Sequence, residues 1–359
     1  MKTKIGIALH RQTVLYCDTT GGDSIVIVSS VSTTFLDTAQ RCEKKLEYRY
    51  VKRYERRVTG VKPERGTWVH ELLAAHYQAI QDGKDPTKAV EEAHSQRLEE
   101  RWNNLFDEEK EALGDIPGQA WAIYERYAER YREADKRWVR ILLVEKYLKI
   151  PMPQLPVPLG IKCDLVVLDD LGFVWVVDHK VVSTIPDEEN RMLDTQGPRY
   201  ILGIQQLMKI KGIKPKGVGM IYDYVRDRVP AKPQLLKNGK GLSKAQIDTD
   251  YDTYLATILE HGFDPADYED KLNDLSLNAR PYFERWQVPK SDERLRQELK
   301  NIRAITERSI YPKEYYARSL DRFSCSWDCE YKNLCLIELE GGDPSLELKA
   351  NFVVRKEDE

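Results

Sequence analysis

The amino-acid sequence predicts an α/β protein with a mixed central sheet and helical segments toward both ends of the chain. The first observation is a run of strand-like segments between residues 141 and 229, interrupted by one helical pattern. The second is the helical, charge-rich sequence on both sides of it, at 32–137 and 240–320. The third is a hydrophobic fraction of 41% over 359 residues, which is sufficient for a substantial core.

Changes in pattern divide the chain into five parts. We expect N-terminal strands in 1–31, a helical segment in 32–140, a strand-rich core in 141–230, a second helical segment in 231–337 and an acidic tail in 338–359. The core is therefore expected in the middle of the chain, with helices from both ends packed around it.

Composition narrows the class of protein. The formal net charge is -3, so any nucleic-acid surface must be a local patch. No apolar run is long enough to span a membrane, and the first residues lack the pattern of a secretory signal. A cytoplasmic protein is expected, and in that compartment the six cysteines favour metal binding or catalysis over disulfides. The chain has no GxxxxGK[ST] loop, which argues against an ATP-driven motor.

The N-terminal half is expected to contain short strands followed by long helices. "SIVIVSSV" is the clearest strand in 1–31. Ser32 can cap a helix that runs from Thr33 into the 50s, and a second helix begins near Thr67. Glu, Arg and Ala then dominate 88–137, in a helical pattern.

The core segment reads as strands around one helix. A "DDLG" turn predicts a hairpin. Thr195 can cap the following helix, whose first turn tolerates Pro198. The expected elements are a strand at 141–150, hairpin strands at 161–168 and 173–182, a helix at 195–212 and a strand at 216–225.

Two aspartates and a lysine interrupt the hydrophobic hairpin strands. Side chains alternate faces along a strand, so Asp178 and Lys180 share one face while His179 points to the other. A tight hairpin would bring Asp164 close to Asp178. A divalent cation such as Mg²⁺ or Mn²⁺ would compensate two adjacent carboxylates. The alternative is a buried Asp–Lys ion pair without a metal.

The sequence around these residues resembles a nuclease superfamily. "GIKCD", "WVVDHK" and "QGPRY" are similar to the motifs of the RecB-like branch of the PD-(D/E)XK nucleases, and match them at Asp164, Asp178, Lys180, Gln196 and Tyr200. The resemblance implies a restriction-endonuclease-like core in which these five residues are catalytic. The Gly-Pro pair inside the last motif puts Gln196 at the start of its helix rather than within it.

The same resemblance implies a metal site and a reaction. "GTWVHELLAAHY" is similar to the helix that carries a metal-binding histidine, here His70, although a lone histidine on a helix is more often structural. Asp164, Asp178, the backbone carbonyl of His179 and, less directly, Glu145 would complete the ligands. The implied reaction is metal-dependent phosphodiester hydrolysis at single-stranded DNA ends, with Lys180 orienting the water. Endonuclease action and a non-catalytic DNA-binding or recombination scaffold are the alternatives.

Four of the six cysteines form a split pattern. Cys325, Cys329 and Cys335 lie within "CSWDCEYKNLC", and Cys42 lies far upstream. This layout resembles the iron–sulfur RecB-like nucleases, such as the AddB nuclease domain and the CRISPR-adaptation exonucleases of the Cas-four type, and implies a [4Fe-4S] cluster joining the two ends of the chain. A structural zinc site is the alternative.

A basic segment follows Cys42. Five of its cations are expected to track a DNA backbone: Lys45, Arg49, Lys52, Arg53 and Arg56. Tyrosines 48, 50 and 54 interleave with them and would either stack on bases or pack in the core. The resemblance also implies protein partners in recombination, repair or CRISPR adaptation.

Overall fold

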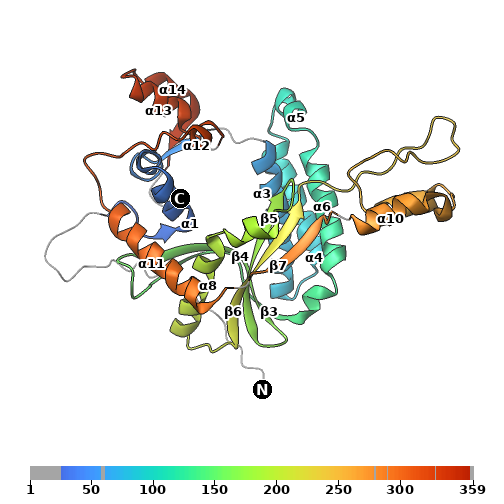
Figure 1. The fold of residues 1–359 in the computed structure, drawn as a ribbon, viewed down its shortest axis with the longest axis horizontal. Coiled ribbons are helices and arrows are strands. Elements are labelled where there is room, and N and C mark those ends of the chain that lie inside the picture. The colour runs from blue at the N-terminus through green and yellow to red at the C-terminus, as the bar shows by residue number, and fades with distance from the viewer. Residues whose placement is uncertain (1–25, 58–60, 279, 289, 328, 356–359) are drawn as a thin grey trace.

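Six strands form the central sheet of the computed structural model, which describes residues 26–57, 61–278, 280–288, 290–327 and 329–355 (Figure 1). The order is β1-β4-β5-β6-β7, with β3 on the other side of β4. The pairs β1–β4 and β5–β6 are parallel and the others antiparallel, which confirms the predicted mixed sheet. The strands are β1 (Val31–Ser32), β3 (Trp138–Ile150), β4 (Leu159–Asp169), β5 (Phe173–Val182), β6 (Gly217–Arg226) and β7 (Phe283–Gln287).

The sheet extends beyond the expected limits of 141–230. β3 begins three residues earlier than that segment, and β7 comes from the expected helical segment 231–337. A long segment separates β6 from β7 in the sequence. After it the chain returns to the sheet, and β7 pairs antiparallel with β6. Most of the expected strands in 1–31 lie outside the described residues. The strand predicted from "SIVIVSSV" is wrong over 26–30, where the backbone is irregular, and only its last residue, Val31, belongs to β1.

The predicted hairpin of β4 and β5 is closed by a side chain. Oδ1 of Asp169 accepts hydrogen bonds from the backbone N–H groups of Leu171 at 3.0 Å and Phe173 at 2.8 Å. Gly172 adopts a φ of 87°, which a residue with a Cβ rarely tolerates. This turn fixes the register of the two strands that carry Asp164 and Asp178.

Helices cover both faces of the sheet (Figure 1). We call the core on one face the α3-side core; it includes Trp68, Leu72 and Ile123. The α8-side core on the other face includes Ile204 and Ile302. The α3 side contains α3 (Val61–Asp82), α4 (Pro86–Arg97) and α6 (Ile116–Tyr131), and the α8 side contains α1 (Thr33–Arg41), α8 (Gln196–Ile210) and α11 (Asp292–Ser309).

Short elements connect these layers. α3 begins at Val61, about one and a half turns before the predicted start near Thr67. The remaining connectors are η2 (Leu98–Trp102), α5 (Asp107–Leu113), η3 (Ala134–Arg137) and α7 (Glu188–Met192).

An arm projects from the sheet between β6 and β7 (Figure 1). It contains α9 (Tyr251–Glu260), η4 (Pro265–Tyr268) and α10 (Glu269–Leu277). Tyr254, Ile258 and Tyr268 form a small hydrophobic core of its own. The arm therefore packs mainly on itself rather than on the sheet.

A segment that follows α1 and the last described residues meet in a second small body. We call it the cysteine lobe: residues 42–57 together with 318–355. β2 (Tyr54–Arg56) pairs antiparallel with β8 (Phe352–Val354), and Tyr48, Tyr331 and Leu334 fill the interior. The other elements are α2 (Glu43–Leu46), the π-helical turn η1 (Glu47–Val51), α12 (Arg322–Trp327), α13 (Lys332–Leu339) and α14 (Ser345–Asn351). Much of the expected acidic tail 338–359 is thus ordered secondary structure in this lobe.

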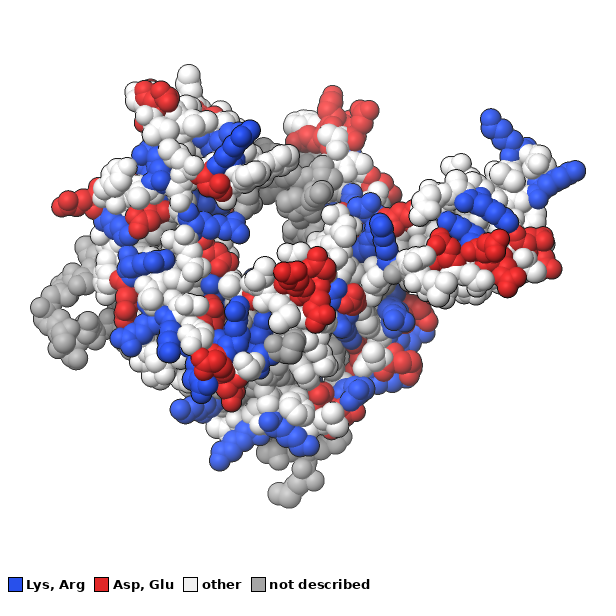
Figure 2. Space-filling view, viewed as in Figure 1, with Lys and Arg blue, Asp and Glu red and all other residues white. Residues whose placement is uncertain are grey.

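The surface mixes both charges. Figure 2 shows lysine and arginine interspersed with aspartate and glutamate on this face, and an opening beside the cysteine lobe. The arm carries basic side chains at its tip and acidic ones along its lower edge (Figure 2). No helix in the described part of the chain is both long and apolar enough to cross a membrane.

Candidate active site

Asp164 and Asp178 lie opposite each other where β4 and β5 separate. Leu165 pairs with Val177 in the last register pair of the hairpin, so the same register puts Asp164 across from Asp178. The ladder does not continue here; instead, the backbone N–H of His179 donates to Oδ2 of Asp164 at 2.9 Å. The charge of Asp178 acts on Asp164 and raises its pKa, but Asp178 is not among the groups that lie within 4.8 Å of one another.

A distortion of β3 and β4 turns Glu145 and Asp164 toward α3. Glu145 has a φ of 44°, which is uncommon for a residue other than glycine, and the register puts it opposite Asp164. Side-chain alternation changes at this level, because Cys163 packs in the α8-side core and Leu165 in the α3-side core. In a regular strand these two residues would share a face.

His70, Glu145 and Asp164 form a compact set of possible metal ligands. One nitrogen of His70 and one oxygen of each acid lie within 4.8 Å of one another. Nδ1 of His70 is 3.6 Å from Oδ2 of Asp164. Imidazole nitrogen and carboxylate oxygen are both ligands for divalent cations, so α3, β3 and β4 together present a candidate metal site.

The protonation of this set suits a divalent cation. Burial, followed by the charges of His179 and Lys180, lowers the pKa of His70 to about 3, so the imidazole is neutral near pH 7. Burial, followed by the charge of Asp178, raises the pKa of Asp164 to about 7. A bound cation favours the ionised carboxylate, so a proton and a metal ion compete for Asp164.

Asp178, Lys180 and Gln196 form a closed triangle beside this set. Nζ of Lys180 lies 2.7 Å from Oδ2 of Asp178 and donates to Oε1 of Gln196 at 2.6 Å. Nε2 of Gln196 donates to Oδ1 of Asp178 at 2.8 Å. Burial disfavours the charge of Lys180, but attraction to Asp178 outweighs it and raises the lysine pKa. Asp178 thus forms the Asp–Lys ion pair that was the alternative to a metal site. Its negative charge also raises the pKa of Asp164.

α8 carries the two remaining residues of the predicted motif. Gln196 is the first residue of the helix, as the Gly-Pro pair predicted. Tyr200 lies one turn further on and is buried in the α8-side core. Burial, followed by the charge of Asp178, raises the pKa of Tyr200, so its side chain remains a neutral phenol.

Asp194 is a further acid beside the site that the sequence analysis did not single out. Its Oδ2 accepts hydrogen bonds from the backbone N–H of Gly197 at 3.1 Å and from the Tyr222 hydroxyl. Asp194 therefore provides the first-turn contact that we expected from Thr195, whose hydroxyl instead donates to Asp37 at 3.4 Å. The sequence signal for this contact was an aspartate two residues before the start of α8, because aspartate side chains commonly accept hydrogen bonds from the first N–H groups of a helix.

The imidazole of His179 points away from the triangle into a buried polar network. Nδ1 of His179 is 3.3 Å from Oδ2 of Asp223, which also accepts from Nε of Arg285 at 3.0 Å and from the Tyr127 hydroxyl. Burial opposes ionisation of Asp223, but Arg285 and His179 together lower its pKa. The network therefore holds β5 in place at His179, the residue whose backbone N–H binds Asp164.

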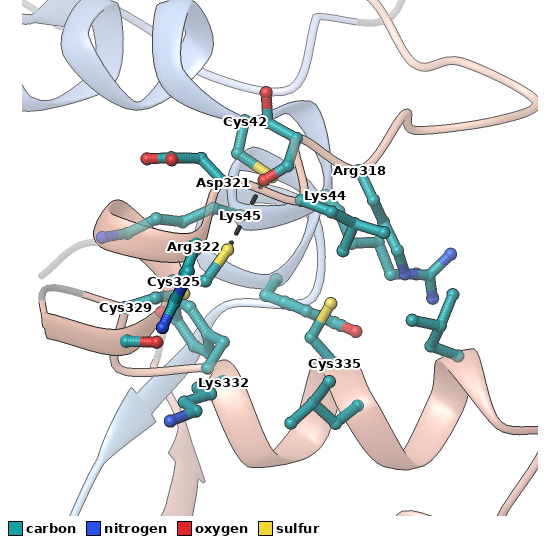
Figure 3. Close-up of a pocket in the computed structure, with 17 residues that line it drawn as sticks. Cys42, Lys44, Lys45, Arg318, Asp321, Arg322, Cys325, Cys329, Lys332 and Cys335 are labelled. Atoms are coloured by element: carbon teal, nitrogen blue, oxygen red, sulfur yellow. Dashed lines mark hydrogen bonds between the residues drawn. The ribbon is translucent and has the colours of Figure 1, made fainter.

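The four predicted cysteines line one pocket of about 340 Å³ in the cysteine lobe (Figure 3). Cys325 comes from α12 and Cys335 from α13, with Cys329 between these helices. Cys42 lies in extended backbone between α1 and α2. The single helix expected from Thr33 into the 50s is therefore interrupted at the cysteine.

The four sulfurs are more widely spaced than the ligands of a single ion. Zinc–sulfur bonds of about 2.3 Å in a tetrahedral site put the sulfurs roughly 3.8 Å apart. Among the described residues, His70, Glu145 and Asp164 are the only set of three or more possible ligands within 4.8 Å, so no three cysteines meet that spacing. Cys163 is apart from the pocket, in the sheet, where burial raises the pKa of its thiol.

Several of the predicted DNA-binding cations contact other groups of the lobe. Arg49 lies 3.2 Å from Glu330, and Lys52 lies 3.3 Å from Glu47. Arg56 donates to the Glu330 carbonyl at 3.2 Å. Lys45 lines the cysteine pocket. The backbone of Arg53 has a φ of 57°, which is uncommon for a residue other than glycine.

The chain matches a known protein family. A family model described as the PD-(D/E)XK nuclease superfamily matches residues 30–336. No curated protein matches the chain significantly. The matched range includes the possible metal ligands, the Asp178–Lys180–Gln196 triangle and the four cysteines of the pocket. Nucleases of this superfamily use divalent metal ions. Because the match covers most of the chain, the protein belongs to the PD-(D/E)XK nuclease superfamily.

Proposed function

We propose that this protein is a metal-dependent exonuclease acting on single-stranded DNA, and that it carries a [4Fe-4S] cluster. The observation that supports the nuclease assignment most directly is the meeting of two groups at one point of the sheet. One is the possible ligand set of His70, Glu145 and Asp164. The other is the triangle around Lys180, whose acid Asp178 raises the pKa of Asp164.

We expect Mg²⁺ or Mn²⁺ at this point. His70, Asp164 and Asp178 would hold the ion, with Glu145 and the backbone carbonyl of His179 as further ligands. These are nitrogen and hard oxygen donors, which suit Mn²⁺, and the oxygen donors suit Mg²⁺. When bound, such an ion would polarise the phosphate and lower the pKa of a coordinated water.

Lys180 is the expected partner of the attacking water. Gln196 holds its amine in place, and Asp178 maintains its positive charge. An ammonium fixed in this way can hydrogen-bond a water or stabilise charge that develops on a phosphate oxygen. Gln196 and Tyr200, one turn apart on α8, are expected to position the scissile strand.

The choice of DNA, of single strands and of end-directed cleavage is supported by resemblance to RecB-like nucleases. We expect Lys45, Arg49, Lys52, Arg53 and Arg56 to exchange part of their contacts within the lobe for phosphates. Protein partners would then belong to recombination, repair or CRISPR adaptation.

The cluster is proposed from the resemblance and from the four cysteines that line a common cavity, although no three of their sulfurs lie within 4.8 Å of one another. Cys42, Cys325, Cys329 and Cys335 would hold it. The cluster would fix the start of the chain to its end and so stabilise the lobe. Purified protein should absorb visible light, and Cys335→Ala should lose this absorbance while Cys163→Ala retains it. A colourless protein containing zinc would contradict the cluster.

Cleavage of end-labelled DNA tests the catalytic proposal. With Mn²⁺, the protein should degrade linear single strands and leave circular single strands intact. Asp178→Ala should abolish cleavage and preserve DNA binding, whereas Asp170→Ala, in the exposed hairpin turn, should have no effect. Equal cleavage by Asp178→Ala would contradict the proposed site. Cutting of circles would indicate an endonuclease, and binding without any cleavage would indicate a scaffold.

A further inference from the structure

The most exposed aromatic rings of the cysteine lobe are not the tyrosines of its basic segment. Tyr48 is buried in the lobe interior, and Tyr54 packs against it. Phe323 and Trp327, in contrast, are 74% and 87% exposed. Large apolar side chains this exposed often mark an interaction surface when they occur together.

The two rings lie on one side of α12. They are four residues apart, a spacing that puts side chains next to each other on a helix. In the view of Figure 1, α12 is on the side of the cysteine lobe that faces α3. Asp321 caps this short helix, because its carboxylate accepts from the backbone N–H groups of Phe323 at 3.3 Å and Ser324 at 2.8 Å. Asp321, the acid that directly precedes Arg322, is therefore occupied within the helix.

Two cations accompany the rings. Arg322 and Lys332 are exposed, and neither forms an ion pair with another residue of the described structure. Figure 3 shows both side chains on the same side of the cysteine pocket, with Lys45 nearby. They differ in this respect from Arg49 and Lys52, which have carboxylate partners. Arg322 and Lys332 are therefore available for an anionic partner.

We infer that Phe323 and Trp327 form a stacking platform for the bases of single-stranded DNA, flanked by Arg322 and Lys332 as phosphate contacts. Exposed rings beside unpaired cations are the combination that binds single strands without sequence preference. The bases of a duplex are stacked inside and cannot reach such rings. The inference rests on the proposed function, because it names the surface by which that nuclease would hold its substrate.

Binding measurements test the platform. Every protein carries Asp178→Ala to prevent cleavage, and fluorescence anisotropy compares a labelled oligothymidine with a labelled blunt duplex. The double variant Phe323→Ala/Trp327→Ala should bind the single strand at least about tenfold more weakly, since stacking contributes roughly 1–3 kcal/mol per base. Duplex binding should be unchanged. Trp327→Phe should retain most of the affinity, and Leu346→Ala, at an 83% exposed site on α14, is the matched control.

The salt dependence tests the two cations separately. Each phosphate contact to a single strand contributes about 0.7 to the slope of log affinity against log salt. Arg322→Gln/Lys332→Gln should therefore lower the magnitude of this slope by about 1.4 for the oligothymidine. The platform variant should leave the slope unchanged, because stacking releases no counterions. A slope unaffected by the cation variant would contradict their role.

Three results would overturn the platform. One is unchanged single-strand binding by the aromatic variant, which would assign the rings to another partner such as a protein. The second is an equal loss on single strand and duplex. The third is a parent protein with no affinity for the single strand. Mn²⁺-dependent cleavage by the wild-type protein is measured in parallel: its absence would refute the proposed function, whereas cleavage combined with unchanged binding would refute only the platform.

Discussion

The backbone N–H of His179 donates a hydrogen bond to the carboxylate of Asp164 at 2.9 Å, at the point where the ladder between β4 and β5 ends. This bond fixes the direction of the Asp164 carboxylate. The imidazole of His179 is held in turn by Asp223. One residue of β5 therefore links the candidate metal site to the buried network behind the sheet.

Metal affinity should depend on pH through Asp164. Because the pKa of this carboxyl is about 7, protons displace metal increasingly as the pH falls below that value. Mn²⁺ affinity measured by calorimetry should rise from pH 5.5 to pH 7.5 and then level off. An affinity independent of pH over this range would contradict the raised pKa.

The same shift gives the opposite trend for stability without metal. The folded protein retains the Asp164 proton up to about pH 7, whereas the unfolded chain releases it near its ordinary pKa of 3.8. Between these values the folded state binds more protons, so this group lowers the free energy of unfolding as the pH rises. Asp164→Asn should remove that contribution, which denaturation in chelator at several pH values would show.

His70 should contribute directly to metal binding. Loss of an outer-shell partner costs roughly 10–100-fold in metal affinity, so His70→Gln, which removes a ligand, should weaken Mn²⁺ binding at least about tenfold. His76→Gln is the matched control, since His76 lies on the same helix and contacts the Tyr124 hydroxyl at 3.0 Å. Equal effects of the two substitutions on Mn²⁺ affinity would indicate a structural role for His70.

Backbone strain at Glu145 should be measurable. Its φ of 44° costs roughly 1–2 kcal/mol for a residue with a Cβ and little for glycine. Glu145→Gly and Glu145→Ala both remove the carboxylate, so they should weaken metal binding equally. Glu145→Gly should nevertheless be about 1 kcal/mol more stable than Glu145→Ala in chemical denaturation. An equally stable alanine variant would refute the strain.

The network behind His179 should matter greatly for stability. Asp223 is fully buried and interacts with Arg285, so Asp223→Asn leaves a buried guanidinium with weakened compensation and should cost about 3 kcal/mol or more. Glu260→Gln, which removes an exposed ion pair with Lys232, should leave the melting temperature unchanged. Similar small shifts in both melting curves would show that the network is not a stabilising element.

Local patterns accounted for much of the site. The turn at 169–172 predicted the register that brings Asp164 opposite Asp178, and strand alternation predicted that His179 would point away from Lys180. The Gly-Pro pair located the start of α8 at Gln196. These features depend on neighbours a few residues away, and such neighbours are visible in a sequence.

The missed features depend on contacts between distant segments. The change of face at Glu145 and Asp164 arises from two strands together, and neither strand shows it alone. The buried network joins α6, β5, β6 and β7, whose packing no local pattern specifies. β7 was read as part of a helical segment because its five residues lie between charged helices. The arm was also missed, because it is held together by a separate small core whose residues are spread along the sequence.

Crystals soaked in Mn²⁺ and measured at the manganese absorption edge test the central claim most directly. The account predicts an anomalous peak coordinated by His70, Asp164 and Asp178, with Glu145 as a further ligand. Loss of that peak in Asp164→Asn crystals would confirm the assignment. A well-occupied manganese ion elsewhere, with these side chains free of metal, would contradict it.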